Sequence, residues 1–292
     1  MTPRSLWHGS RLGDVLPWGG VSLLGASFAS GGLLHLDPAR AALAMLSVLG
    51  LALFAFVVND LFDRSANRRE ARSDRPLASG EFPAGLAYGL AGFGAAFPLV
   101  SSLLLGDRLS LGWSLASLAL GAAYSAPGPH LKCRPWLAWL VHLFQGTLGF
   151  ALPAGMVRAA FLPGDLLCGL WFGLLFAGGH LHHQAIDAPD DEAAGTRTLA
   201  VRRGVRTALW LGFAQFALAE AWALALALSS LTPSGWIWAQ SGPYLAYLIG
   251  FAFAARARPD PARLRLLRTI YRTAYLTGGA ALLVLSGIGA SP

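Results

Sequence analysis

Two short acidic stretches of this chain share one spacing. The first runs from Asn59 to Asn67 and the second from Gln184 to Asp191, and each closes a long apolar run. Within both stretches, oxygen-bearing side chains recur at steps of three and then four residues: Asp60, Asp63 and Asn67, then Gln184, Asp187 and Asp191. That spacing stacks side chains along one face of a helix. Carboxylates gathered where lipid-facing sequence meets water are costly unless cations hold them, so the pattern predicts metal ions and an anionic ligand.

The residue types in and around these stretches are those that bind a metal diphosphate. Carboxylate oxygens are hard ligands of the kind that Mg2+ prefers, and substrate phosphates usually complete its coordination. We therefore predict a Mg2+ site whose ligands come from Asp60, Asp63, Asp187, Asp191, Asn59, Asn67 and Gln184. Basic side chains that could bind the diphosphate follow the stretches or share their side of the membrane: Arg68, Arg72, Arg75, Lys132 and Arg197. A single acidic stretch at a membrane surface is more often solvated loop, but two with the same spacing on one side favour a site.

The composition places these residues in a membrane protein. Of the 292 residues, 55% are hydrophobic and 13% are charged, whereas an ordinary soluble domain has roughly 25% charged residues. Apolar segments of about the 20 residues that a bilayer requires can be counted nine times. We therefore predict an all-α, polytopic membrane protein, a single domain over residues 1–292, with spans near residues 16–35, 39–58, 84–105, 109–126, 135–156, 162–181, 205–230, 236–255 and 270–289.

The distribution of positive charge predicts the orientation of the spans. With nine spans, all but three of the 22 Lys and Arg residues fall on the side of the N-terminus, and the three exceptions are Arg40, Arg108 and Arg158. By the positive-inside rule the basic side is cytoplasmic, and both acidic stretches face it. We predict a multi-pass protein of a bacterial inner membrane. The basic residues are spread over several loops without a stacking platform, so we expect no nucleic acid partner, and no obligate protein partner is evident.

Three motifs follow one another in an order that is similar to that of a known family. They are Asn59-Asp60-x-x-Asp63 followed by Arg75-Pro76-Leu77-x-Ser79-Gly80, then Tyr124-Ser125-x-Pro127-x-x-x-x-Lys132, then Asp187-x-x-x-Asp191-x-x-x-Gly195-x-Arg197-Thr198. From about residue 15 to the C-terminus, the chain resembles the UbiA superfamily of intramembrane prenyltransferases. The resemblance implies a UbiA-type bundle of about nine transmembrane helices. The chain departs from the family pattern at Asn67 and Gln184. Each stands where the family usually or often has Asp, so two negative charges are lost.

The resemblance also implies an activity. It is the Mg2+-dependent transfer of a prenyl group from an isoprenyl diphosphate to a small aromatic or lipidic, hydrophobic acceptor within the bilayer. The bound cation and the basic residues would stabilise the departing diphosphate while the site keeps water from the allylic cation. The implied catalytic residues are Asp63, Asp187, Asp191, Lys132 and Tyr124, and the implied substrate-binding residues are Asn59, Arg68, Arg72, Arg75, Lys132 and Arg197.

Several alternatives stay open at this level. Within the family, a terpene cyclase would act on the prenyl diphosphate alone, and outside enzymology a membrane protein could bind a lipid diphosphate without turnover. The histidines of the run His180-Leu181-His182-His183 could instead belong to a di-iron site, which we consider the least favoured reading because the other histidines are scattered. His142 and Gln145 face the same way on one predicted helix and could contact the acceptor. Glu220 lies inside a predicted span, which indicates either function or a polar partner.

Overall fold

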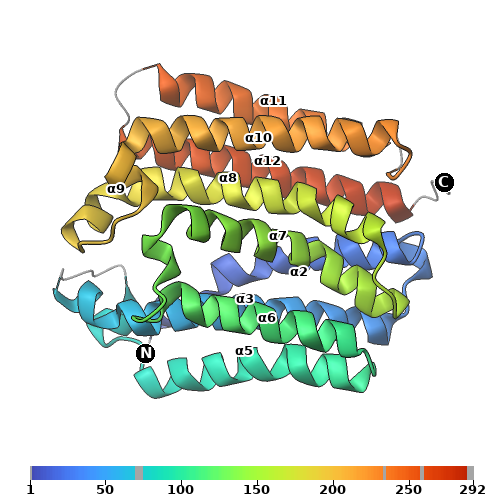
Figure 1. Cartoon of the computed structure of the whole chain (residues 1–292), viewed down its shortest axis with the longest axis horizontal. Coiled ribbons are helices and arrows are strands. Elements are labelled where there is room, and N and C mark those ends of the chain that lie inside the picture. The colour runs from blue at the N-terminus through green and yellow to red at the C-terminus, as the bar shows by residue number, and fades with distance from the viewer. Residues whose placement is uncertain (1, 70–74, 233–234, 257–259, 288–292) are drawn as a thin grey trace.

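The computed structural model describes residues 2–69, 75–232, 235–256 and 260–287, and all regular structure in these ranges is helical. The prediction of an all-α protein is confirmed. Within these ranges, nine helices have 18 or more residues, and each overlaps one predicted span. They run side by side in alternating directions (Figure 1) and comprise α2 (Leu12–Ala29), α3 (Pro38–Arg69), α5 (Ala84–Leu104), α6 (Arg108–Ser125), α7 (Pro135–Arg158), α8 (Pro163–Ala193), α10 (Val205–Leu228), α11 (Gly235–Ala255) and α12 (Pro261–Gly287).

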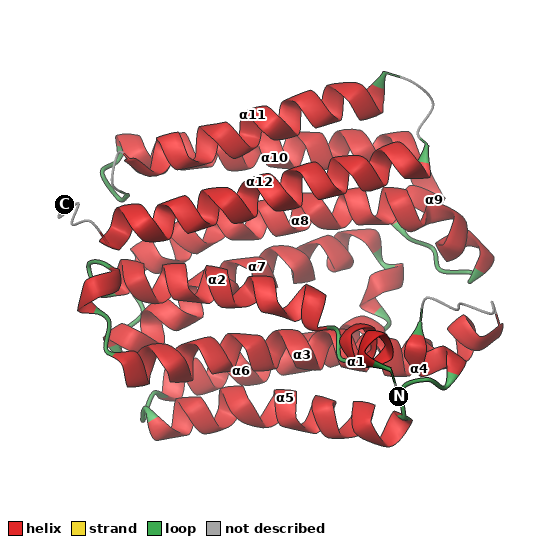
Figure 2. Ribbon diagram, turned by 180° about the vertical axis from the view of Figure 1, so that it is seen from behind, coloured by secondary structure: helices red, strands yellow, loops and turns green. Residues whose placement is uncertain are grey.

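Short helices gather at one end of this bundle. Figure 2 shows α1 (Pro3–Gly9) and α4 (Pro76–Ser79) beside each other at that end, and the two helices are in contact. The turn η2 (Leu131–Cys133) precedes α7, and α9 (Leu199–Arg203) follows α8 at the same end. A further turn, η1 (Leu33–His35), lies between α2 and α3. Proline occupies a first-turn position of α4, α7 and α8, where its missing N–H leaves no hydrogen bond unmade.

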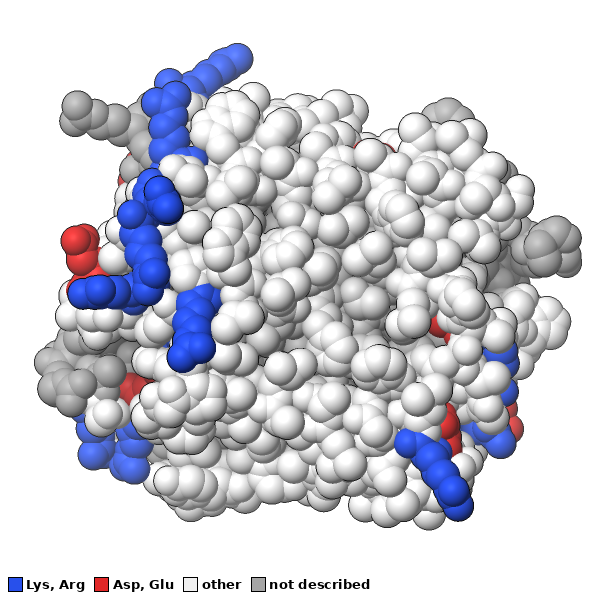
Figure 3. Space-filling model, in the orientation of Figure 1, with Lys and Arg blue, Asp and Glu red and all other residues white. Residues whose placement is uncertain are grey.

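The outer surface of the bundle suits a lipid environment. In the part of the chain that the structure describes, five helices are long and apolar enough to cross a membrane by length and composition: α3 over Pro38–Ser65, α5, α7, α8 and α10. Large apolar side chains point outward, including Ile249 at 66% and Leu276 at 62% exposure. On the face shown in Figure 3, charged side chains gather towards the two ends and a broad uncharged band separates them. The five spans make this a multi-pass membrane protein, while the full count of nine stays a prediction.

The lengths of α3 and α8 place both acidic stretches at one end of the bundle. The two helices have 32 and 31 residues, whereas a bilayer requires about 20. Each helix therefore continues through its acidic stretch, as the three-then-four spacing predicted. Helix α7 packs against both α3 and α8, and α2 packs against α3, α7 and α8. This arrangement leaves the acidic ends of α3 and α8 facing each other across a space that α2 and α7 line.

Close helix packing at Gly25 gives a first testable expectation. A Cβ atom at Gly25 in α2 would collide with the carbonyl oxygen of Phe150 in α7. We expect Gly25→Ala to cost about 1–3 kcal/mol of stability by overpacking and to lower the melting temperature of the purified protein in detergent. Gly20→Ala is the matched control on the same helix, because a Cβ there meets nothing within 4 Å. An equal melting temperature for Gly25→Ala and Gly20→Ala would contradict this packing.

Candidate active site

One cavity joins the two acidic stretches. It has a volume of about 280 Å³ and is lined by α2, α3, α6, α7 and α8 together with residues next to α4 and α9. Its polar end carries side chains of both stretches: Asn59, Asp60, Asp63, Asn67, Gln184, Asp187, Asp190 and Asp191. Its other end is apolar and is lined by Trp18, Val48, Leu51, Leu148 and Gly149. The cavity therefore offers a charged part for a polar head and an apolar part for a hydrocarbon tail.

Asp60 lies between two guanidinium groups. Its carboxylate oxygens are 3.6 Å from Nε of Arg11 and 3.5 Å from Nη1 of Arg75. Arg11 stands directly before α2 with a left-handed φ of 59° and also contacts Asp14 at 3.3 Å. The guanidinium of Arg11 stacks 5.4 Å from the ring centroid of Phe56, which holds it over the cavity wall. Asp60 is thus already balanced by two fixed cations.

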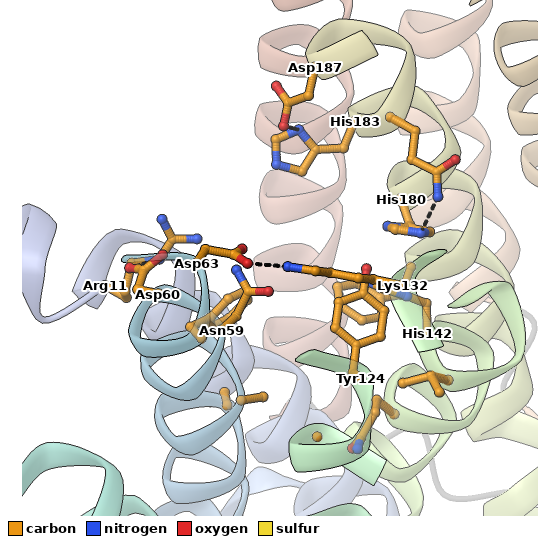
Figure 4. A pocket seen from close by; sticks show the side chains of 18 of the residues that line it. Arg11, Asn59, Asp60, Asp63, Tyr124, Lys132, His142, His180, His183 and Asp187 are labelled. Atoms are coloured by element: carbon orange, nitrogen blue, oxygen red, sulfur yellow. Dashed lines mark hydrogen bonds and ion pairs between the residues drawn. The ribbon is translucent and has the colours of Figure 1, made fainter. Parts of the chain in front are cut away.

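Asp63 and Lys132 contact each other in the polar part of the cavity. The ammonium group of Lys132, in η2, donates to Oδ1 of Asp63, and Figure 4 shows this contact spanning from α3 to the segment before α7. One turn earlier on α3, the side-chain oxygen of Asn59 accepts a hydrogen bond of 2.8 Å from Ser125 Oγ. Tyr124, beside Ser125 on α6, also lines the cavity. The second motif is therefore brought into contact with the first.

The wall that α8 provides is held by its own local contacts. Asp187 Oδ2 lies 3.5 Å from Nδ1 of His183, one turn earlier on the helix. Gln184 is buried, and its side-chain oxygen accepts a hydrogen bond of 3.0 Å from the backbone N–H of Leu199 at the start of α9. The amide nitrogen of Gln184 is 2.7 Å from Nε2 of His180. Gln184 therefore fastens the segment after α8 to the cavity wall, a role that the sequence pattern did not indicate.

The charges that line the cavity favour a divalent cation. Among the described residues that line it, the carboxylates of Asp60, Asp63, Asp187, Asp190 and Asp191 outnumber the cations of Arg11, Arg75 and Lys132. The surplus negative charge matches a hard cation with oxygen ligands. In the part of the chain that the structure describes, no three His, Cys, Asp or Glu side chains converge closely enough to hold a metal alone. The donor set therefore fits Mg2+, which commonly takes one or two carboxylates and completes its coordination with water and substrate phosphates.

Two of the predicted diphosphate-binding arginines, Arg68 and Arg197, do not line this cavity. Arg68 does not line it, and its Nε donates instead to the carbonyl of Ala78 at 3.0 Å, which ties the end of α3 to α4. Arg197 is exposed and does not line the cavity either. Arg72 lies outside the described residues. We therefore assign the cationic part of the cavity to Arg75, Lys132 and Arg11, and Arg11 was missed because no motif surrounds it.

The remaining polar residues in the helices have mostly packing roles. His182 is buried, and its Nε2 is 2.9 Å from the hydroxyl of Tyr247 on α11. Glu220 on α10 accepts a hydrogen bond of 3.3 Å from Ser241 on α11, so its partner comes from a neighbouring helix. The absence of a three-ligand His, Cys, Asp or Glu cluster within the described ranges gives the di-iron reading no support. His142 and Gln145 do share the cavity wall, as their spacing predicted.

Comparison with known proteins identifies the family. A model of the UbiA prenyltransferase family matches residues 20–284. This chain belongs to the UbiA prenyltransferase family. A relative, the protoheme IX farnesyltransferase of Anaeromyxobacter sp. (strain Fw109-5), is 30% identical over 234 residues, which cover 77% of this chain and 75% of the relative. The resemblance seen in the motifs is thus confirmed, and the chain is a prenyltransferase of the membrane.

Solved structures share the fold of this UbiA prenyltransferase. The apo structure of a UbiA homologue from Aeropyrum pernix K1 has a TM-score of 0.75 at 22% identity and covers 94% of this chain and 98% of its own. The structure of a UbiA homologue from Archaeoglobus fulgidus bound to DMAPP and Mg2+ has a TM-score of 0.66 at 20% identity and covers 94% of this chain and 99% of its own. The bundle seen in Figure 1 is therefore the UbiA fold.

Proposed function

We propose that this UbiA prenyltransferase moves a prenyl group from an isoprenyl diphosphate, bound with Mg2+, to a small aromatic or lipidic acceptor. The observation that carries the proposal is the single cavity in which a surplus of carboxylates and three fixed cations adjoin an apolar, aromatic interior. The diphosphate would occupy the charged part and the prenyl chain the apolar part. The Archaeoglobus fulgidus homologue bound to DMAPP and Mg2+ supports a substrate of this kind.

The cavity residues divide into two working groups. Asp60, Asp63, Asp187 and Asp191 would hold Mg2+ directly or through water, and that cation supplies charge neutralisation to the leaving diphosphate. Arg75, Lys132 and Arg11 would donate hydrogen bonds to the diphosphate oxygens. Asn59 and Tyr124 would orient the same group from α3 and α6, and Asn67, which also lines the cavity, would add a neutral oxygen. The apolar walls would keep water from the allylic carbon as the C–O bond breaks.

The basic residues near the cavity also indicate how the protein is oriented in the membrane. Arg11, Arg75 and Lys132 line the polar part of the cavity, and Arg202 and Arg203 lie in α9 at the same end of the bundle, so the positive-inside rule supports a cytoplasmic mouth. Nine spans, one for each long helix, would give an odd number of crossings with the N-terminus on the cytoplasmic side. A bacterial inner membrane fits this arrangement.

The function is tested by pyrophosphate release from the purified full-length chain. We expect release from geranyl or farnesyl diphosphate that requires Mg2+, stops on chelation with EDTA and resumes when Mg2+ is restored. A panel of phenolic, quinone-precursor, glycerol-lipid and protoheme acceptors should contain one that yields a prenylated product. Protoheme belongs in the panel because of the relative that is named a protoheme IX farnesyltransferase.

The outcomes separate the competing functions. A prenylated acceptor supports the transferase. A cyclic hydrocarbon formed from the diphosphate alone identifies a terpene cyclase. Tight binding of the diphosphate without Mg2+-dependent release under any acceptor condition identifies a binding protein and refutes the proposal.

A further inference from the structure

Two histidines stack on each other in the cavity wall, deeper than the acidic stretches. The rings of His142 on α7 and His180 on α8 lie 3.5 Å apart with an angle of 12° between their planes. Tyr124 meets both edge-on, and Phe176 lies beside His142. All four side chains line the cavity, and Figure 4 shows His180 below His183 and Asp187 along α8, with His142 and Tyr124 lower still.

Hydrogen bonds fix which nitrogen of each histidine carries the proton. Nδ1 of His142 is 2.8 Å from the carbonyl oxygen of Ala138, and a carbonyl can only accept. Nδ1 of His142 therefore carries the hydrogen, and its Nε2 keeps a lone pair. The side-chain oxygen of Gln184 is fixed by the N–H of Leu199, so the amide nitrogen of Gln184 must face Nε2 of His180 and donate to it. His180 therefore carries its hydrogen on Nδ1.

The remaining two ring nitrogens face the cavity with opposite hydrogen-bonding character. Nε2 of His142 is an acceptor and Nδ1–H of His180 is a donor. No described residue bonds to either atom, and neither is among the buried polar atoms that lack a partner, so both stay accessible from the cavity that their residues line. A neighbouring donor and acceptor of this kind complement a hydroxyl group, which donates its proton to one and accepts from the other.

The two histidines lie at the depth in the cavity where we expect the reacting carbon of the prenyl diphosphate. His180 precedes Asp187 by seven residues on α8, which sets it about 10 Å deeper along the helix axis. The reacting carbon of a prenyl diphosphate is bonded directly to the diphosphate and points away from it. An acceptor that attacks this carbon must therefore lie between the charged end and the apolar end, where Tyr124, His142, Phe176 and His180 form the wall.

From this geometry we infer that His142 is the base of the reaction and removes the proton from the hydroxyl group of an aromatic acceptor. The inference rests on the proposed prenyl transfer. The C1–O bond of the prenyl diphosphate breaks, the electron pair leaves with the diphosphate, and C1 bonds to the acceptor while the hydroxyl proton moves to Nε2 of His142. If the new bond forms at a ring carbon, the proton on that carbon returns to the oxygen, and the same single proton is released overall. Nδ1–H of His180 stabilises the developing oxyanion.

The stacking of His142 on His180 means that only one of the two imidazole rings can carry a positive charge at a time. Two imidazolium rings at 3.5 Å would repel each other strongly. The N–H of Gln184 holds His180 neutral, because a protonated Nε2 would oppose that donor. His142 alone is therefore free to accept the proton, and its Nδ1–H bond to Ala138 stabilises the resulting cation.

The test uses the full-length protein and His142→Phe, which keeps a ring in the stack but removes both nitrogens. With Mg2+ and geranyl or farnesyl diphosphate, the wild type should prenylate members of a panel of phenols, catechols and hydroquinones, but not their methyl ethers. His142→Phe should reduce transfer to an un-ionised phenol about 100-fold or more, the usual contribution of a general base. The same variant should lose less than about tenfold with a nitrophenol that is already ionised at neutral pH, since no proton then has to be removed.

Control measurements distinguish the loss of a base from misfolding of the variant and from a failure to bind the prenyl diphosphate. His35→Phe, on the exposed turn η1 at the opposite end of the bundle, should behave as the wild type. Farnesyl thiolodiphosphate should bind His142→Phe with an unchanged Kd in the presence of Mg2+. An equal loss for phenols and nitrophenols, reaction of the methyl ethers, or no phenol turned over by a wild type that still binds the donor would each overturn the inference. A Soret shift of protoheme that depends on His142 would also overturn it, because that nitrogen would then bind iron.

Discussion

Asp63→Asn is expected to reduce prenyl transfer about 100- to 1,000-fold, the usual loss when a preorganised electrostatic group of an active site is removed. Asp63 lines the polar end of the cavity and contacts Lys132 directly. The amide keeps the size of the side chain but removes the charge that would hold Mg2+, and it also leaves Lys132 without its ion-pair partner. The measurement is the initial rate of Mg2+-dependent pyrophosphate release with saturating prenyl diphosphate.

The loss of activity in Asp63→Asn should come with a changed dependence on Mg2+ concentration, and the variant should still fold. Glu81→Gln removes a carboxylate from the exposed loop between α4 and α5 and should keep wild-type activity. Asp63→Asn should elute as the wild type on size exclusion in detergent and should require more Mg2+ for half-maximal rate. If Asp63→Asn released pyrophosphate at the wild-type rate and the wild-type Mg2+ concentration, Asp63 would have no role in holding the cation.

The fold was predictable because lipid solvation leaves a strong signal in the sequence. Each of the nine long helices of the described chain overlaps an apolar segment, and the three-then-four spacing correctly placed Asp60, Asp63, Asp187 and Asp191 on helices. The same signal says little about which helices cross the membrane, because only five meet the criteria of length and composition. The spacing of apolar residues along the chain predicts a helix. Whether that helix crosses the membrane also depends on whether neighbouring helices shield its polar side chains from lipid.

The residues that line the candidate site could be predicted where they lie in motifs, but not where contacts between distant segments decide which side chain enters the cavity. Arg11 stands outside any motif, and only the left-handed turn before α2 brings it to Asp60. Arg68 follows the first motif directly, yet it is taken up by the carbonyl of Ala78. Gln184 has the right spacing for a ligand, but its oxygen bonds to the backbone of Leu199. Such choices depend on contacts between segments far apart in the chain, which residue spacing does not encode.

The contact between the two stacked histidines could not be predicted from the sequence either. His142 and His180 lie on different helices, and nothing in the spacing of either one indicates the other. They meet because α7 and α8 pack closely at Gly146 and Gly173, where a Cβ atom at Gly146 would come within 2.8 Å of the Gly173 Cα. Small residues at a helix contact therefore determine a polar feature of the cavity that the sequence motifs leave out.

Lys132→Met is expected to lower the rate of pyrophosphate release about 10- to 100-fold, because hydrogen bonds to charged groups contribute about 1.5–3 kcal/mol each. Lys132 is the only lysine of the chain, and its ammonium group reaches across the cavity to Asp63. When a diphosphate enters, this cation can move from the carboxylate to the leaving oxygens with little change in its surroundings. Methionine keeps the length and apolar stem of the side chain and removes only the charge.

Arg134→Met is the matched control for this charge, since Arg134 is exposed two residues further along the same segment and does not line the cavity. It should retain wild-type kcat and KM. Lys132→Arg should restore only part of the activity, because a planar guanidinium presents its donors differently from a compact ammonium. Equal activities for Lys132→Met and Arg134→Met would show that the diphosphate does not use Lys132, and the cationic part of the cavity would then reduce to Arg11 and Arg75 around Asp60.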